Sequence, residues 1–398
     1  MPSLFTIASA VSGAFSLAGY IQGAIGTVLL ERFRRTVHVP GDPSPSPQQT
    51  TSTLREGDTL PGVTIMKPLH GDEPLLEEAL ETFFQQDYPA ARQIVFGLQD
   101  KNDPALNVVQ RLQKRYPKQD VAVVIDQTEH GPNRKVGNLI NMFPACKHDI
   151  LIISDSDIHV STDYVTSIVQ ALQQDDVQLA TTLYAGLPAS QTLVRKLGAC
   201  SINTNFLPGV MMSRLMGRQD CLGATMALRR KHLAEIGGLE ALVQHVADDA
   251  VLGQYIRRNG GKIALARTIC QTTVAETTLS ELFHHELRWG RTVRSVEPLG
   301  YGLSALQLPL FWGSLCVLFA PARFFSWALL GGGLLGRHIM TRRIGQLTNC
   351  AMPSLFPYLI FRDWLSALVM TGSARGTHVT WRGRSLHISR GKKLPKSL

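Results

Sequence analysis

The sequence predicts an α/β domain flanked by membrane segments, and three observations support this. Between residues 62 and 300, short β-rich runs alternate with amphipathic stretches, which is typical of a mostly parallel α/β sheet. A long uncharged run, Leu4 to Leu30, lies near the N-terminus, and further apolar runs follow residue 300. The chain therefore divides into an N-terminal anchor, a linker, an α/β domain, a C-terminal membrane region and a basic tail, with expected bounds 1–35, 36–61, 62–300, 301–374 and 375–398.

The N-terminal run is predicted to be a transmembrane helix. Leu4 to Leu30 carries no charge and exceeds the roughly 20 residues that a helix needs to cross the hydrocarbon. A signal peptide would carry its basic residues before the apolar run, whereas Arg32, Arg34 and Arg35 follow it here. The positive-inside rule then places the N-terminus outside and residue 31 onward in the cytoplasm. The proline-containing segment 37–61 has the composition of a linker.

Within the α/β domain, four strands and two helices can be predicted from local pattern. The strands are expected at 63–66, 93–98, 121–125 and 150–154. The first helix is expected to begin near Asp72 and Pro74, and the second to have Asp103 as its N-cap and Pro104 at its first position. Ligands of such sheets bind at the carboxyl ends of the strands, so the residues directly after each strand are candidates for a site.

The C-terminal region is less regular. Tyr301 to Ala322 is a second uncharged run of spanning length, Phe324 to Gly336 is shorter, and Cys350 to Ala374 is interrupted by Arg362 and Asp363. The last two could be spans or interfacial and re-entrant pieces. We favour an even number of crossings after the α/β domain, which would keep the basic tail in the cytoplasm.

Charge and cysteine content narrow the function classes. The net charge of +9 is compatible with nucleic acid, an anionic bilayer or a phosphorylated substrate. No acidic residue follows Trp364, while seven Lys and Arg residues lie between Arg375 and Lys396, so the excess favours anionic lipid on the cytoplasmic side. There is no RNA-binding motif or zinc-finger spacing, and we predict no nucleic acid partner. The six cysteines form no C-x-x-C pair, which predicts reduced, buried thiols.

Two strand ends carry carboxylates suited to a nucleotide. Asp155 and Asp157, one residue apart after the fourth strand, could approach one Mg²⁺ or Mn²⁺ ion that also binds a diphosphate. The same pattern can simply cap a helix. Asp100 follows the second strand, where a carboxylate can accept hydrogen bonds from a nucleoside. For Asp103 we favour a role in the turn and cap.

Two later motifs combine charge with a helix. Asp248 and Asp249 are either partners of a helix dipole or, in the functional interpretation, include a base of raised pKa that deprotonates an attacking hydroxyl. The segment His285 to Trp289 leads into a basic stripe of Arg288, Arg291 and Arg294. That stripe is either a solvated or lipid-facing edge or, beside a diphosphate, a clamp made of arginine and tryptophan.

Together these motifs resemble those of ceramide glucosyltransferases and occur in the same order. They are Lys67-Pro68-Leu69-His70-Gly71, Gln99-Asp100 to Asp103-Pro104, Asp155-Ser156-Asp157, Cys221-Leu222-Gly223 with Leu228-Arg229-Arg230, Ala247-Asp248-Asp249, His285 to Trp289, and Trp381-Arg382-Gly383-Arg384. The resemblance covers nearly the whole chain and implies an inverting, metal-dependent enzyme with a GT-A fold, the nucleotide-diphospho-sugar transferase domain. It implies a UDP-sugar donor and a lipid acceptor at a membrane.

Within that group the chain looks most similar to bacterial hopanoid-associated glycosyltransferases. Three segments carry this resemblance: 130–142, 221–230 and 284–289. It implies transfer of N-acetylglucosamine, or alternatively glucose, to bacteriohopanetetrol, with ceramide as the other acceptor. The expected location is the bacterial inner membrane, with the α/β domain in the cytoplasm.

Roles follow from the resemblance position by position. On the donor side, Asp100 would hold uridine, Asp155 and Asp157 the metal and diphosphate, and Lys135 a phosphate. This assigns Mg²⁺ or Mn²⁺ as the cofactor.

On the acceptor side, Asp249 would be the catalytic base, and Arg288 with Trp289 would close the site. Two positions depart from the family pattern. Ceramide enzymes have Gln or Arg where His285 stands, and an aromatic residue commonly follows the acidic pair where this chain has Ala250.

Two other function classes can be weighed against this hypothesis. A processive polysaccharide synthase shares the carboxylates and the Arg-Trp element, but needs a membrane pore for its polymer, for which the predicted spans are too few. A non-enzymatic membrane scaffold would not need Asp100, Asp155, Asp157 and Asp249 at the ends of strands and helices.

Overall fold

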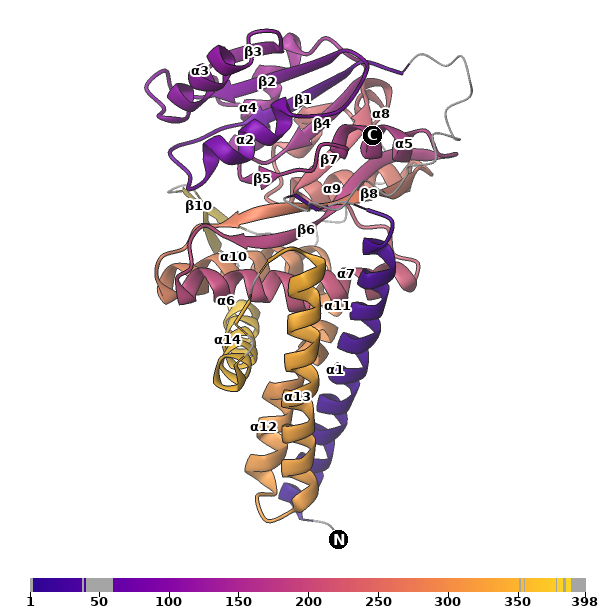
Figure 1. Ribbon diagram of the computed structural model, residues 1–398, viewed down its shortest axis with the longest axis vertical. Coiled ribbons are helices and arrows are strands. Elements are labelled where there is room, and N and C mark those ends of the chain that lie inside the picture. The colour runs from indigo at the N-terminus through magenta and orange to yellow at the C-terminus, as the bar shows by residue number, and fades with distance from the viewer. Residues whose placement is uncertain are drawn as a thin grey trace. The chain divides into compact units, whose positions relative to one another are not determined.

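The computed structural model describes residues 3–37, 39–40, 60–350, 352–353, 355–376, 378–381 and 384–387. Most of the expected linker 36–61 and most of the basic tail 375–398 lie outside these residues. The described chain divides into two compact units, labelled by element in Figure 1. We call residues 35–184 and 219–273 the sheet unit, and residues 3–34, 185–218 and 274–387 the helical unit, and describe each by itself.

The sheet unit is built on an eight-stranded sheet of order β3-β2-β1-β4-β7-β6-β8-β5. Its strands are β1 (Val63–Pro68), β2 (Arg92–Leu98), β3 (Asp120–Ile125), β4 (Ile150–Ser154), β5 (Ile158–His159), β6 (Val177–Pro188), β7 (Thr225–Arg229) and β8 (Lys262–Val274). The ends of β6 and β8, residues 185–188 and 274, already belong to the helical unit. All four predicted strands are confirmed.

The direction of the strands differs from the prediction in half of the sheet. β3, β2, β1 and β4 are parallel, whereas β7 runs antiparallel to β4 and β6, and β5 antiparallel to β8. The expectation of a mostly parallel sheet is therefore correct for β1 to β4 and wrong beyond them. A strand buried on both faces is an apolar run in either direction, so the pattern of residues does not encode its orientation.

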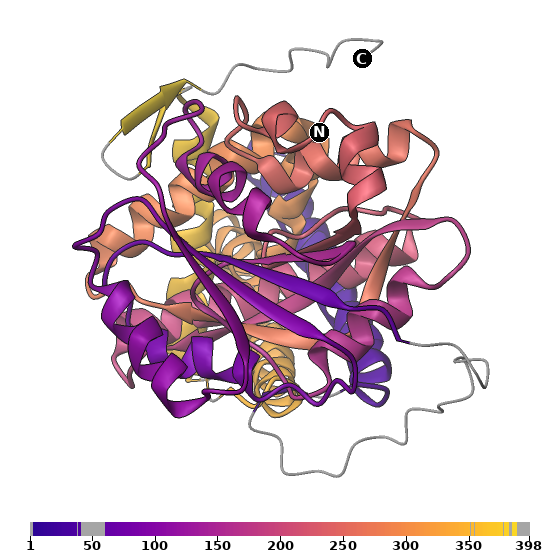
Figure 2. The same cartoon turned by 90° about the horizontal axis from the view of Figure 1, so that it is seen from above.

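Helices cover both faces of the parallel half, as Figure 2 shows. Successive side chains of a strand point to opposite faces, and accordingly Ile65 and Met66 of β1 belong to two different buried clusters. One face packs against α2 (Leu76–Phe84), α3 (Ala105–Arg115) and α5 (Tyr164–Leu172). The other packs against α4 (Arg134–Met142), α8 (Arg230–Glu235) and α9 (Asp248–Arg258).

The turn after β1 explains why α2 begins later than predicted. Gly71 has φ +77° and Leu75 has φ +60°, so the backbone makes left-handed turns before the helix starts at Leu76. The Asp103 carboxylate holds this turn, accepting the Gly71 N–H at 3.0 Å from each of its oxygens. It also accepts the Ala105 N–H at 2.9 Å at the start of α3. The predicted role of Asp103 in the turn is confirmed, but the N-cap residue is Pro104 and not Asp103, because α3 begins one residue later than predicted, at Ala105.

The helical unit contains one helix that meets the length and composition of a membrane span by itself. Among the described residues this is α1 (Leu4–Arg34), and a second candidate exists only if a bent helix pair counts as one span. The unit further contains α6 (Leu193–Ser201), α7 (Leu207–Leu215), α10 (Leu279–Val296), α11 (Pro298–Leu303), α12 (Pro309–Phe319), α13 (Phe324–Leu347), α14 (Phe356–Ala374) and the paired strands β9 (His378–Trp381) and β10 (Arg384–His387).

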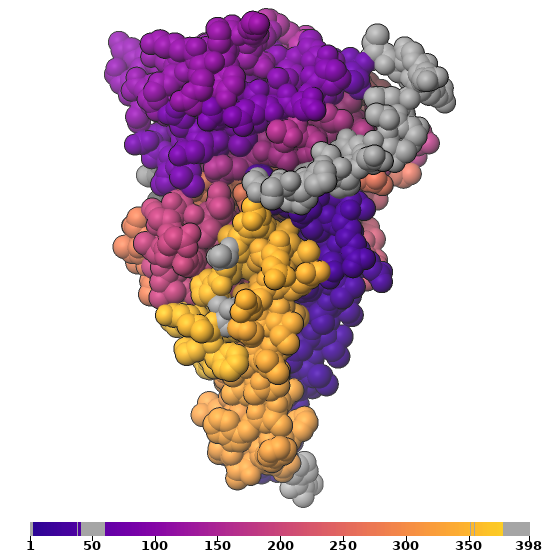
Figure 3. Space-filling model, in the orientation of Figure 1, coloured from indigo at the N-terminus to yellow at the C-terminus, as the bar shows by residue number. Residues whose placement is uncertain are grey.

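The run Tyr301 to Ala322, expected to be of spanning length, is not one straight helix. Segments 298–307 and 309–319 meet at an angle of 66°. Pro309 stands at the start of α12 and has no N–H to donate to the preceding turn, which accounts for a break at this point. On α1, Gly19 lies against the Leu306 carbonyl and Pro309, where a side chain would not fit. The α1 helix is also side by side with α13, as Figure 3 shows in outline.

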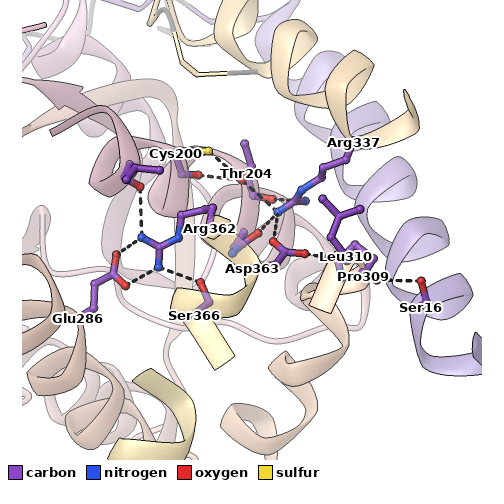
Figure 4. Close-up of polar contacts among 12 residues, drawn as sticks. Ser16, Cys200, Thr204, Glu286, Pro309, Leu310, Arg337, Arg362, Asp363 and Ser366 are labelled. Carbon is purple, nitrogen blue, oxygen red and sulfur yellow. Dashed lines mark hydrogen bonds and ion pairs between the residues drawn. The ribbon is translucent and has the colours of Figure 1, made fainter. Parts of the chain in front are cut away.

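The two charges that interrupt the last apolar run lie buried within a continuous α14. Figure 4 shows that Arg362 pairs with Glu286 of α10, with N···O distances of 2.9 and 2.6 Å. Asp363 accepts the Leu310 N–H of α12 at 2.9 Å and lies 3.5 Å from Arg337 of α13. Buried charges are tolerated when they are paired in this way. The network therefore connects α10, α12, α13 and α14.

Candidate active site

The candidate site of the sheet unit lies at the carboxyl ends of its parallel strands. Asp155, Ser156 and Asp157 form the loop between β4 and β5, which we call the D-S-D loop. The Asp155 side chain is 37% exposed, so its carboxylate is accessible. Asp157 instead points inward and accepts the Thr272 hydroxyl of β8 at 2.5 Å. Burial, followed by the neighbouring Asp155 carboxylate, raises the pKa of Asp157, while the Thr272 hydroxyl opposes this.

Lys135 joins the D-S-D loop to the acidic pair on α9. Asn133 caps α4 by accepting the Val136 N–H at 3.1 Å, which places Lys135 in the first turn of that helix. The Lys135 ammonium lies 2.7 Å from Asp155 and 3.3 Å from Asp248. Burial disfavours the charged form, but Asp155 and Asp248 outweigh it and raise the pKa of Lys135 above its ordinary value. The structure thus brings Lys135 together with Asp155, and the phosphate-binding role that the resemblance implies for Lys135 stays a prediction.

Asp249 lies beside this group at the start of α9 but in a different environment from Asp248. Asp248 is buried and faces Lys135, whereas Asp249 accepts the N–H of Ala250 at 2.7 Å. Burial and then the adjacent Asp248 carboxylate raise the pKa of Asp249 to about 6. A carboxylate with this pKa is ionised at neutral pH and still a better proton acceptor than an ordinary aspartate.

The Asp249 carboxylate packs against Gly223, a position where a side chain would not fit. A Cβ atom on Gly223 would lie 2.9 Å from Asp249 Oδ2, closer than non-bonded atoms tolerate. Gly223 belongs to the Cys221-Leu222-Gly223 motif noted in the sequence, but its contact with Asp249 links residues 26 positions apart and could not be seen there.

Asp100 is exposed at the end of β2, and its carboxylate accepts the Asn102 N–H of its own turn at 2.9 Å. It occupies the same edge of the sheet as the D-S-D loop, because β2 and β4 are both parallel to β1. No contact joins it to Lys135, Asp155 or Asp249 among the described interactions. Its expected role in holding uridine stays a prediction.

Arg288 and Trp289 lie on α10 of the helical unit, as the sequence predicted for a helix at this position. The His285 and Trp289 rings, one helical turn apart, are edge to face with centroids 4.5 Å apart. Glu276, which sequence reasoning missed, pairs with His285 Nδ1. Two arginines of the predicted basic stripe, Arg291 and Arg294, donate to backbone carbonyls of the last residue of α14 and of the two residues that follow it.

Asp155 and Asp157 are the candidate ligands of a divalent cation that would arrive with a diphosphate. Among described residues no cluster of three or more His, Cys, Asp and Glu side chains could hold a metal. Asp155 and Asp157 supply two carboxylates on one loop, and Mg²⁺ or Mn²⁺ completes its shell with phosphate oxygens and water in many enzymes. Such an ion would depend on the substrate for the rest of its ligands.

Comparison with known proteins decides the family. The family model described as glycosyl transferase family 21 matches residues 17–394. The chain belongs to glycosyltransferase family 21. It is therefore a sugar-transferring enzyme, and the resemblance noted in the sequence is confirmed at the level of the family.

Curated relatives include ceramide glucosyltransferase 1 of Caenorhabditis elegans, 22% identical over 347 residues, which cover 85% of this chain and 74% of that protein. A ceramide glucosyltransferase of Candida albicans is 35% identical over 122 residues, 28% of this chain and 22% of that one. Among solved structures, the mannosyltransferase PcManGT of Pyrobaculum calidifontis, in complex with GDP-Man and Mn²⁺, aligns with a TM-score of 0.50 and 16% identity over 91% of this chain and 99% of that one. This likeness supports the GT-A fold predicted for this family 21 enzyme.

Proposed function

We propose that this enzyme transfers one sugar from a UDP-sugar to a lipid hydroxyl at a membrane, with inversion at the anomeric carbon. The observation that carries the proposal is the group formed by Lys135, Asp155 and Asp249 in the sheet unit, where a cation, an accessible carboxylate and a carboxyl group of raised pKa occur together. The cation and the accessible carboxylate suit the binding of a diphosphate donor together with a metal ion. The carboxyl group of raised pKa suits the deprotonation of an attacking hydroxyl.

The proposed step is a single displacement. The lipid hydroxyl gives its proton to Asp249 as its oxygen bonds to the anomeric carbon, and the bond from that carbon to the β-phosphate oxygen breaks. Lys135 lies 2.7 Å from Asp155 and would donate to the departing UDP. Mg²⁺ or Mn²⁺ held at Asp155 and Asp157 would further neutralise the diphosphate. Asp100 would bind the uridine, and Arg288 with Trp289 would close the site.

For the substrates, we propose UDP-N-acetylglucosamine or UDP-glucose as donor and a hopanoid, bacteriohopanetetrol, as acceptor. Ceramide is the second candidate acceptor, because the curated relatives are named ceramide glucosyltransferases. Membrane attachment through α1, with the sheet unit in the cytoplasm of a bacterium, would place the site where such lipids are available.

The test is an assay of the purified enzyme in detergent or nanodiscs. Each labelled UDP-sugar is paired with bacteriohopanetetrol or ceramide, and the lipid products are identified by mass spectrometry. We expect one sugar per lipid, activity that is lost in excess EDTA and restored by Mn²⁺, and weakened UDP binding in Asp100→Ala. Asp126→Ala is a matched control, because Asp126 follows the neighbouring strand β3. Full activity in EDTA would contradict the metal site, and a growing polymer would favour the processive alternative.

A further inference from the structure

The D-S-D loop rests on a buried lysine that the proposed reaction does not use. Lys67 is fully buried on β1, and its Nζ atom donates to the Asp155 backbone carbonyl and lies 3.3 Å from the Ser154 hydroxyl. It also lies 3.9 Å over the Phe83 ring. A lysine is almost never buried in this way unless its donors have partners. Here those partners belong to the loop that carries the candidate metal ligands.

The same loop is held at its other end by β8. Thr272 donates its hydroxyl to the Asp157 carboxylate at 2.5 Å, and the Thr273 N–H donates to the Asp157 carbonyl at 3.1 Å. Between these points, the Ser156 hydroxyl donates to Glu73 at 2.5 Å. Every residue of the loop is therefore held by a side chain from a strand or turn distant in sequence.

We propose that Lys67 and Thr272 are positioning residues, which hold the D-S-D loop in the shape that binds the metal–diphosphate group of the donor. The inference rests on the proposed function and deepens it at the donor side. Lys67 holds the backbone at Asp155, so the accessible carboxylate starts from a fixed point. Thr272 holds the Asp157 carboxylate in one orientation. The loop then needs no reorganisation when the nucleotide binds.

Two matched pairs of variants test this. Thr272→Val removes the hydroxyl at nearly constant volume, and Thr272→Ser restores it. Lys67→Met removes the Nζ donor, and Lys67→Arg keeps an N–H donor. The controls are Thr268→Val, a buried threonine on the same strand whose hydroxyl contacts Ser161, and Lys147→Met, an exposed lysine paired with Asp120.

The readout is the affinity for Mn²⁺ in the presence of UDP, measured by electron paramagnetic resonance, together with KM for donor and acceptor. We expect affinity to fall about fivefold in Thr272→Val and about tenfold or more in Lys67→Met, as for loss of one or two buried hydrogen bonds. KM for the acceptor should not change. The Ser and Arg variants should recover at least part of the loss, and both controls should match the wild type.

The experiment distinguishes failure of the proposed function from failure of the positioning role. If wild-type enzyme binds no Mn²⁺–UDP, the proposed donor is wrong, and the inference falls with it. If wild-type enzyme binds it and folded Thr272→Val retains that affinity within twofold, the positioning role is overturned while the proposed function stands. Melting temperature and near-ultraviolet circular dichroism verify folding. Should Lys67→Met fail to fold, the Thr272 pair alone decides.

Discussion

At the scale of single residues, the account depends on the different environments of Asp248 and Asp249. The two are adjacent in sequence, yet Asp248 faces Lys135 at 3.3 Å, while the Asp249 carboxylate accepts the N–H of Ala250 in its own helix. The Asp248 carboxylate is thus engaged in an ion pair with Lys135. Asp249, whose pKa burial and Asp248 raise to about 6, is the better base.

The first prediction concerns this base. Asp249→Asn should retain UDP affinity and lose about 10² to 10⁴ in kcat, the usual effect of removing a positioned base. In the wild type, the base must be ionised to accept a proton. The value of kcat/KM should therefore be constant above the pKa of about 6 and fall roughly tenfold per pH unit below it. Near-normal transfer by Asp249→Asn would move the base to Asp248 or elsewhere.

The second prediction concerns the space beside that base. Gly223→Ala should displace the Asp249 carboxylate, because the added Cβ would lie 2.9 Å from Oδ2. We expect kcat to fall about tenfold or more with unchanged UDP affinity. Gly217→Ala is not a suitable control, because Gly217 has φ +85°. Gly137→Ala is a suitable control, because the nearest atom to a Cβ added at Gly137 would be 3.8 Å away. Equal activity of the Gly223 and Gly137 variants would contradict the close contact.

At the scale of elements, the helical unit depends on buried ion pairs between helices. Arg362 is 1% exposed on α14 and makes two N···O contacts with Glu286 on α10. The latter helix also carries Arg288 and Trp289. Because Glu286 lies two residues before Arg288 on the same helix, the pair fixes the rotation of that helix and with it the face that presents Arg288 and Trp289.

The third prediction follows from this pair. Glu286→Gln leaves a buried guanidinium without a counter-charge and should destabilise the protein by about 3–5 kcal/mol. The double variant Glu286→Gln/Arg362→Met should lose less stability than Glu286→Gln alone, because it leaves no unpaired buried charge. As a control, Arg343→Gln removes an exposed pair with Glu31 on helices of the same unit and should cost about 1 kcal/mol or less. Thermal unfolding in detergent measures all three. A double variant less stable than Glu286→Gln would contradict the argument.

At the scale of the whole molecule, the strand positions could be predicted from the sequence because they depend on local pattern. The strand β4 and the carboxylates after it were located correctly. The direction of the strands beyond β4 could not be predicted, because an apolar run has the same composition in a parallel and in an antiparallel strand. Contacts made by tertiary folding, such as Lys67 with the D-S-D loop or Gly223 with Asp249, have no signal in the spacing of residues.

The C-terminal region shows the same limit. The interruption at Arg362 and Asp363 suggested a broken apolar segment, whereas the structure buries both charges in a continuous α14. A charge pattern in one segment cannot reveal that its partners, Glu286 and Arg337, lie on other helices. Conversely, the break near Pro309 falls inside an uninterrupted apolar run.

The fourth prediction concerns topology. Because Arg32, Arg34 and Arg35 follow the apolar part of α1, we expect residue 31 onward to be cytoplasmic. Green fluorescent protein fused after Arg35 should fluoresce, and alkaline phosphatase at the same position should be inactive. Moving the charges, with Arg32, Arg34 and Arg35 replaced by Gln and three Arg residues placed before Leu4, should reverse both results. Active phosphatase in the unaltered fusion would refute this topology.

The most direct test of the central claim is the anomeric configuration of the product. The proposed step uses no covalent nucleophile, because one carboxylate at Asp249 suffices as the base for a single in-line attack. With an α-linked UDP-sugar as donor, the account predicts a β-linked glycolipid. Proton NMR of the purified product would show this in the coupling constant of the anomeric proton. An α-linked product would contradict single displacement and, with it, the role assigned to Asp249.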